Sequence, residues 1–147
     1  MKLEKILIDL AFAILTKRLK AATISISSFE LVEKYLLHKL IAEEREIFGA
    51  LWLDMKLRLI AMEDIAMGTV NQVCVYPREI VKSALRHNAT AVIFYHNHPT
   101  GEAVPSENDK LMTTNVKKLL HAIDVNLLDH IIVSGTKTRS LAKRGEL

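Results

Sequence analysis

The segment from residue 91 to residue 120 constrains the fold more than any other part of this 147-residue chain. Residues 91–95 are apolar and rich in β-branched and aromatic side chains, which predicts a buried strand. Proline and glycine residues then indicate an irregular loop at 99–105, and Ser106 is a good N-cap for a helix that continues to about Leu120. We therefore expect a buried strand, a short loop and a helix in direct succession.

Three side chains that can bind a metal lie in this segment. His96 and His98 follow the strand, and side chains two apart in an extended chain point the same way. Pro99 disfavours helical dihedrals at His98, so the extended His-x-His geometry is enforced locally. With Ser106 as the N-cap, Asp109 falls in the first helical turn, where the helix dipole favours a carboxylate. Ser-x-x-Asp also resembles a capping box.

Each of these residues has an ordinary structural interpretation by itself. Asp109 fits a helix-start acid, Ser106 fits a simple cap, and two histidines are acceptable polar residues at a strand end. The combination at this spacing favours a metal site, because two imidazoles and one carboxylate are typical of catalytic zinc, which keeps its fourth position for water. A closed structural site usually adds cysteine, but the single cysteine, Cys74, lies in a separate apolar segment.

The motif as a whole resembles the metal-binding motif of the JAB/MPN (JAMM) metalloproteases. The order and spacing agree: His96-x-His98-Pro99, six residues, then Ser106-x-x-Asp109. This form of the motif is similar to the bacterial RadC-like branch of that family. Further segments agree with the branch: Glu44 to Phe48, Gly68-Thr69, Tyr76 to Glu79, and Leu128 to Val133.

The resemblance covers roughly residue 27 to the C-terminus and implies an α+β fold, with a JAB/MPN-like mixed β-sheet flanked by helices. We accordingly divide the chain into an N-terminal helical extension, residues 1–26, and a JAB/MPN (RadC-like) domain, residues 27–147. Longer family members carry a helix-hairpin-helix-like segment before this domain, where this chain has a short helix. That departure weakens a DNA-binding role taken from the family.

The resemblance also implies a catalytic glutamate beside an early strand, where Glu43, Glu44 and Glu46 are the candidates. If residues 46–53 form a strand, Glu46 stands at the start of its apolar face. The alternative is a solvated charge run at the end of a helix, which describes Glu43 and Glu44. We favour Glu46 as the catalytic residue.

The implied activity is that of a zinc-dependent hydrolase. Zn²⁺ held by His96, His98 and Asp109 lowers the pKa of bound water toward ~7. Glu46 takes the proton of that water and passes it to the leaving amine, and Ser106 donates a hydrogen bond to the developing oxyanion. The bond cleaved is a peptide or isopeptide amide, so the expected partner is a peptide or protein. The alternative is a DNA-associated accessory protein or a metal-dependent nuclease linked to DNA repair.

Composition bounds the remaining possibilities. Half of the residues are hydrophobic and 25% are charged, with five glycines and three prolines, which favours a compact soluble domain without long linkers. One cysteine excludes an intramolecular disulfide framework and suits a reducing cytoplasm. A net charge of +3 is only mildly basic, and 5% aromatic residues offer little stacking surface. Composition therefore gives nucleic-acid binding little support.

The first 20 residues are apolar between charges. Glu4 and Asp9 interrupt any signal-peptide core, and no run of about 20 apolar residues exists, so we expect no membrane span. Apolar residues recur at helical spacing and cover more surface than one short helix buries by itself. We expect this amphipathic helix to pack on the rest of the domain or on a second copy of the chain, as in a homo-oligomer.

The remaining patterns predict an α+β element order. A capping box at Ser27 to Glu30 opens a helix that ends near Leu40. The other expected elements are strands at 46–53 and 57–66, a strand at 71–76, a helix from Pro77 to about Asn88, and a strand at 125–133.

Four further histidines lie outside the motif. His38, His87 and His121 lie on expected helices without a partner motif, which indicates surface or packing residues. Two interpretations of His130, which adjoins Asp129, stay open: a structural residue, or a hydrogen-bonding residue near the site.

Overall fold

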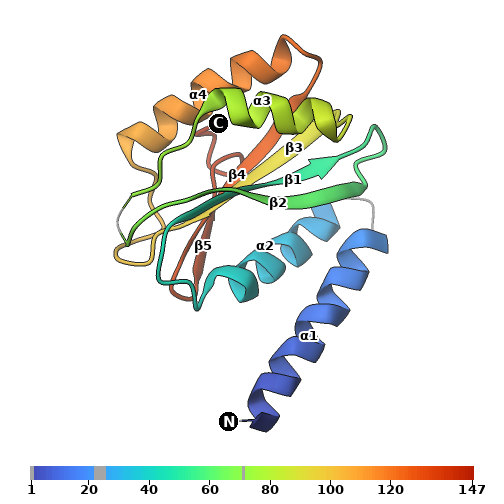
Figure 1. Cartoon of the computed structure of the whole chain (residues 1–147), viewed down its shortest axis with the longest axis vertical. Helices are drawn as coiled ribbons and strands as arrows, with labels where there is room; N and C mark the ends of the chain where they lie inside the picture. Colours follow the sequence, from blue (N-terminus) through green and yellow to red (C-terminus); the bar gives the residue numbers. More distant parts are fainter. Residues whose placement is uncertain (1, 22–25, 71) are drawn as a thin grey trace.

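The computed structural model describes residues 2–21, 26–70 and 72–147. Its elements are α1 (Lys2–Ala21), α2 (Ile26–Leu40), β1 (Ile47–Leu53), β2 (Leu59–Met67), α3 (Pro77–Arg86), β3 (Ala91–Asn97), α4 (Glu107–His121), β4 (Asn126–Ser134) and β5 (Lys137–Ser140). The strands form one sheet in the order β2-β1-β3-β4-β5. The pair β3 and β4 is parallel, and the other neighbouring pairs are antiparallel. This mixed sheet with its helices confirms the predicted α+β class (Figure 1).

Helices cover both faces of the sheet (Figure 1). Helix α2 lies on one face and shares a hydrophobic core with Ile93 and Tyr95 of β3. Helices α3 and α4 lie on the other face and share a second core with Val92 and Phe94. Because successive side chains of a strand point to opposite faces, β3 supplies alternate residues to the two cores. The side chain of His96 therefore lies on the α4 face.

The pairing of β1 with β3 brings two distant parts of the sequence together. The strands are antiparallel, and Phe48 lies opposite His96. The start of β1 therefore adjoins the end of β3 that carries the histidines, which places Glu46 beside them.

Two features of the sheet differ from the sequence-based expectation. The sequence predicts a strand at 71–76. This prediction is wrong for residues 72–76, which form no regular element. Thr69 N donates to Gln72 O at 2.8 Å, so the chain turns here and leaves the sheet after β2. Strand β5 was not expected, because its residues are polar and lack an apolar run. It forms by pairing with β4 across a two-residue turn that begins at Gly135, whose φ of 58° suits glycine.

Other boundaries agree with expectation to within two residues. Strand β2 begins at Leu59, after a turn in which Leu57 has a φ of 58°. Helix α2 begins at Ile26, and the cap expected at Ser27 lies outside the side chains that the structure describes. His38 and His121 are exposed, whereas His87 contacts Glu63 at 2.9 Å, so these three histidines lie at the surface or in packing as expected.

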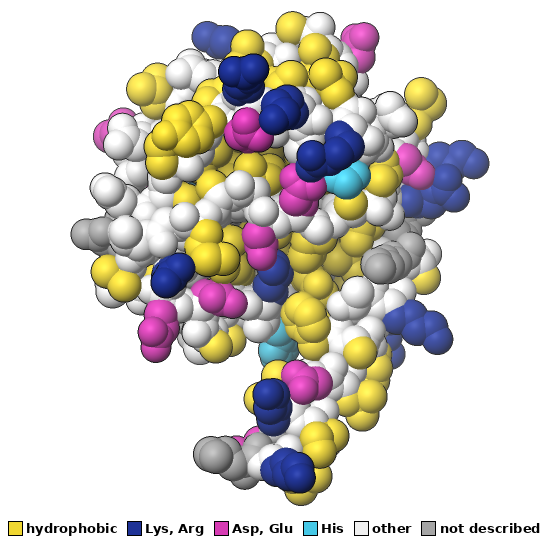
Figure 2. Space-filling model, in the orientation of Figure 1, with side chains coloured by type: hydrophobic (Ala, Val, Ile, Leu, Met, Phe, Trp, Pro, Cys, Tyr) yellow, Lys and Arg dark blue, Asp and Glu magenta, His cyan; other side chains and the backbone are white. Residues whose placement is uncertain are grey.

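Helix α1 contacts the domain through its C-terminal half. Leu19 is buried, and the ring of Phe12 stacks on Tyr35 of α2 with 4.9 Å between centroids. Toward the N-terminus, Leu3 and Leu7 are 68% and 56% exposed, and Figure 2 shows hydrophobic side chains along this projecting part. Within the described ranges, no helix combines the length and the apolar character needed to cross a membrane.

Candidate metal centre

The two histidines of the motif are held in extended chain at the end of β3. His98 N donates to Val133 O of β4 at 2.8 Å, which continues the pairing of the strands past the end of β3. Ser134 Oγ lies 3.0 Å from His98 O and 2.8 Å from Gly101 O, so its single hydroxyl proton bonds to one carbonyl or is shared between the two, which holds the start of the loop. The predicted extended His-x-His geometry is therefore present, and both imidazoles reach the same site.

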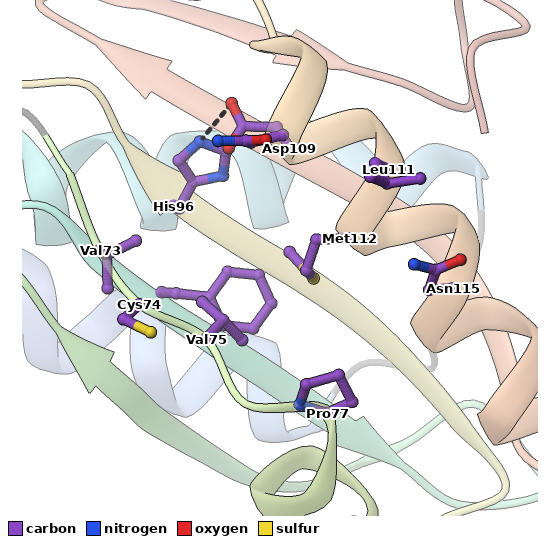
Figure 3. A pocket seen from close by; sticks show the side chains of 11 residues that line it. Val73, Cys74, Val75, Pro77, His96, Asp109, Leu111, Met112 and Asn115 are labelled. Atoms are coloured by element: carbon purple, nitrogen blue, oxygen red, sulfur yellow. Dashed lines mark ion pairs between the residues drawn. The ribbon is translucent and has the colours of Figure 1, made fainter.

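The carboxylate of Asp109 is fixed at the start of α4 by the predicted capping box. Asp109 N donates to Ser106 Oγ at 3.0 Å, and Ser106 N donates to Asp109 Oδ2 at 2.8 Å. The same Oδ2 lies 3.3 Å from His96 Nε2 and 3.2 Å from His98 Nε2, and Figure 3 shows the first of these contacts. The strand end and the helix start thus bring their three polar groups to one point.

The spacing of these three atoms fits a tetrahedral metal. Ligands at about 2.0–2.1 Å from zinc lie about 3.3 Å from one another in a tetrahedron. The two contacts of Asp109 match this edge, whereas the two Nε2 atoms, 2.7 Å apart, lie closer together than the edge requires. His98 Nδ1 lies 3.0 Å from Glu102 O, which only accepts, so Nδ1 is a donor and Nε2 of the neutral ring presents its lone pair. Imidazole and carboxylate are common zinc ligands, so His96, His98 and Asp109 suit a divalent cation.

Charge at the cluster also favours a cation. Burial raises the pKa of Asp109, but hydrogen bonding to the His96 and His98 rings in their protonated forms outweighs it and holds the pKa well below its ordinary value. The hydrogen bond to Asp109 raises the pKa of His98, although burial opposes this. Asp109 is therefore a carboxylate throughout the neutral range, and its charge attracts a proton or a metal to the two rings.

Glu46 lies beside this cluster, immediately before β1. Its backbone N donates to Thr69 O and its carbonyl accepts from Gly68 N, both at 2.7 Å. Its buried side chain lines a cavity of about 480 Å³ together with His98 and Ser106, whereas Glu43 and Glu44 are exposed. Burial raises the pKa of the Glu46 carboxyl, and His98 and then His96 oppose the rise.

Asn97 fixes the position of Glu46 from the opposite face of β3. Its Oδ1 accepts from Ile47 N at 2.7 Å, and its Nδ2 donates to Arg45 O at 2.8 Å. These bonds hold the residues on both sides of Glu46. Sequence reasoning treated Asn97 as the spacer between two histidines, although strand alternation already places its side chain on the face away from them.

His130 reaches the site, and Asp129 does not. His130 is fully buried, and its Nε2 lies 2.7 Å from His96 Nδ1. Its Nδ1 lies 2.7 Å from Oγ1 of Thr113 on α4. Asp129 instead accepts hydrogen bonds from Ser140 Oγ and Ala142 N at 2.5 and 2.9 Å. The hydrogen-bonding interpretation of His130 thus has a structural basis, and the Asp129 carboxylate binds the chain around β5.

Thr113 is a contact residue that the sequence interpretation missed. It lies four residues after Asp109 on α4, so both side chains lie on the same helix face. That helical spacing was a usable signal, but the partner on β4 depends on the parallel register of β3 and β4.

A second cavity, of about 340 Å³, adjoins the cluster on the α4 side. Figure 3 shows His96 and Asp109 at one end of it, Pro77 at the other, and Met112 of α4 along its side. Its lining is mostly apolar, because Val73, Val75 and Leu111 contribute side chains here. The cavity therefore suits an apolar group placed next to the cluster of His96, His98 and Asp109.

The sequence is similar to one protein family and to several curated proteins. The profile of the family described as RadC-like JAB domain matches residues 26–146. A UPF0758 protein of Pseudoalteromonas translucida is 49% identical over 114 residues, which is 78% of this chain and 51% of that protein. A UPF0758 protein of Stenotrophomonas maltophilia is 49% identical over 116 residues, 79% of this chain and 50% of that protein.

A more extended match is to a UPF0758 protein of Albidiferax ferrireducens, which is 41% identical over 140 residues, 95% of this chain and 59% of that protein. The chain thus spans about half of the length of the curated relatives it matches. The names of these relatives state no activity.

Proposed function

The chain belongs to the RadC-like JAB domain family, and from this premise we propose that it is a zinc-dependent hydrolase of the JAMM type, acting on peptide or isopeptide amides. One observation carries the proposal: the three ligand atoms converge next to a cavity that Glu46 and Ser106 also line. A metal site built for structure alone has no need of a buried glutamate at its open side.

In this proposal His96, His98 and Asp109 hold the zinc. When bound, zinc acts as a Lewis acid and makes water nucleophilic near neutral pH. The protein contributes a preformed set of ligands. Asp109 is oriented by the capping box and His98 by Glu102 O, so little reorganisation precedes binding.

Glu46 is the proposed proton carrier. Its carboxylate takes a proton from the attacking water and delivers it to the leaving nitrogen. Burial raises its pKa, and a base with a raised pKa holds a proton more strongly at neutral pH. The bonds to residues 68 and 69 fix the backbone at Glu46, so the carboxylate stays at the edge of the cluster.

Ser106 is the proposed oxyanion donor. The capping box uses its Oγ as an acceptor, which leaves the hydroxyl proton for a substrate. A donor aimed at a developing oxyanion is worth roughly 2.7 to 4 kcal/mol in other hydrolases. Ser106 therefore serves both the helix and the reaction.

The apolar cavity beside His96 favours a peptide over a nucleic acid as the substrate. It accepts a side chain next to the scissile amide, whereas phosphate groups need cations. The single cysteine, Cys74, suits a reducing compartment, so we place the protein in the cytoplasm, with a peptide or protein as its partner.

The test compares zinc content and activity in three variants. Elemental analysis is expected to find one zinc per chain in wild type and little in His98→Ala. In a screen of zinc-loaded protein against peptide libraries and nucleic acids, wild type is expected to cleave peptides. Glu46→Gln is expected to keep zinc and lose cleavage, while Glu43→Gln, a matched change at an exposed position, keeps both.

Three outcomes would overturn parts of the proposal. Equal zinc in wild type and His98→Ala removes the metal assignment. Full activity in Glu46→Gln removes the proton carrier. Zinc-dependent cleavage of nucleic acids without cleavage of any peptide replaces the amidase by the nuclease alternative.

A further inference from the structure

A chain of hydrogen bonds links helix α4 to His96 through the interior. Thr113 Oγ1 lies 2.6 Å from Asp109 O, His130 Nδ1 lies 2.7 Å from Thr113 Oγ1, and His130 Nε2 lies 2.7 Å from His96 Nδ1. Thr113, His130 and His96 are all buried. Water therefore does not compete for these groups, so each must satisfy its neighbour.

The donor and the acceptor of each of these hydrogen bonds follow from the bond between Thr113 and Asp109 O. A carbonyl oxygen only accepts, so Thr113 uses its single hydroxyl proton on Asp109 O. Its oxygen must then accept from His130, which places a proton on His130 Nδ1. Full burial favours the neutral form of His130, so its Nε2 is unprotonated and accepts from His96 Nδ1.

We propose that Thr113 and His130 are positioning residues that fix the tautomer of His96, with the proton on Nδ1 and the lone pair of Nε2 facing His98 and Asp109. The inference deepens the proposed function, because it says how one zinc ligand is prepared. A single hydrogen bond fixes the same tautomer in His98, because its Nδ1 faces the Glu102 carbonyl directly. In their neutral forms, both rings therefore present the lone pair of Nε2 to a metal at the point that Asp109 faces.

Loss of the Thr113 hydroxyl is expected to reverse the hydrogen bond between His130 and His96. In Thr113→Val, His130 Nδ1 has no acceptor, so His130 is stabilised with its proton on Nε2. That proton is then donated to His96 Nδ1, and His96 carries its own proton on Nε2, where the metal binds. Zinc affinity is expected to fall roughly 10- to 100-fold, the usual effect of removing such an outer partner.

The experiment uses three variants of two adjacent threonines. Thr113→Val removes the hydroxyl at nearly constant shape, Thr113→Ser restores it, and Thr114→Val makes the same change at an exposed position one residue on. Zinc affinity is measured by competition with a chromophoric chelator. The protonated nitrogen of each histidine is read from ¹⁵N chemical shifts in two-dimensional NMR of the metal-free protein.

The expected result is tight zinc binding and a protonated His96 Nδ1 in wild type, Thr113→Ser and Thr114→Val, with weaker binding and a changed tautomer in Thr113→Val. Protonation of His96 Nε2 in the neutral wild-type ring would overturn the inference, as would unchanged affinity in a folded Thr113→Val. If wild type binds no zinc but shows the stated tautomers, the positioning role stands and the proposed function fails. The experiment thus tests the positioning role of Thr113 and His130 separately from the proposed zinc-dependent function.

Discussion

Replacing Asn97 by alanine tests how the position of Glu46 is maintained. The side chain accepts a buried hydrogen bond from Ile47 N at 2.7 Å and donates a partly buried one to Arg45 O at 2.8 Å. Ile47 is 2% exposed, so water cannot replace the first bond. Arg45 is exposed, so water can replace the second.

The stability that Asn97→Ala loses follows from the different exposure of these two hydrogen bonds. Leaving the buried Ile47 N–H unpaired costs about 1–3 kcal/mol, and the exchange of the Arg45 bond for water costs about 1 kcal/mol or less. We expect Asn97→Ala to lose about 1–4 kcal/mol, which lowers the Tm of a chain of this size by roughly 3–15 °C. Asn97→Asp keeps an acceptor for Ile47 N, but it buries a carboxyl group against the Arg45 carbonyl, so its loss is expected to be at least as large.

Urea unfolding and thermal melting measure the loss, with Asn126→Ala, a change at an exposed position of β4, as the control. Because Asn97 faces away from His96 and His98, zinc content should stay at the wild-type level while hydrolysis falls. Wild-type stability in Asn97→Ala would refute the hydrogen-bond reasoning. Loss of zinc with hydrolysis would show that Asn97 acts on the ligands rather than on Glu46.

Two further predictions concern the sheet. Gly49→Ala should lower stability by about 1–3 kcal/mol in urea unfolding, because an added Cβ overlaps the Tyr95 ring opposite it on β3, and the additional change Tyr95→Leu should recover part of the loss. Asp129→Asn should gain stability relative to wild type as the pH rises above about 4, since burial raises the pKa of the Asp129 carboxyl. A group whose pKa is raised by folding destabilises the fold as it ionises; parallel pH profiles of the two proteins would contradict this cause.

Local rules were enough to predict that His96, His98 and Asp109 converge, because each rule acts within a few residues. Strand alternation and Pro99 place His96 and His98 on one face, and the Ser106 cap places Asp109 in the first helical turn. The structure agrees with each of these geometries. Glu46 reaches the cluster through the pairing of β1 with β3, which local rules do not predict. The assignment of Glu46 from the sequence rests on the family resemblance instead.

The partners of these three side chains could not be settled from the sequence, for a physical reason. His130 meets His96 because β3 and β4 run parallel with Phe94 opposite His130, a register that no local pattern specifies. The same holds for β5, whose polar residues become a strand because β4 offers them an edge. In contrast, residues 72–76 have an apolar pattern, but the chain turns at Thr69 and takes them out of the sheet.

Strand β1 is long enough to keep the turn at its far end well away from Glu46. The strand begins next to Glu46 and ends at Leu53, and seven residues at about 3.3 Å each span roughly 23 Å. The turn that follows is closed by Asp54, which accepts from the backbone N–H groups of Lys56 and Arg58, and Met55 at its tip is 84% exposed. An affinity tag or a fluorescent reporter inserted at Met55 is therefore expected to leave the end of the sheet that carries the proposed metal site undisturbed.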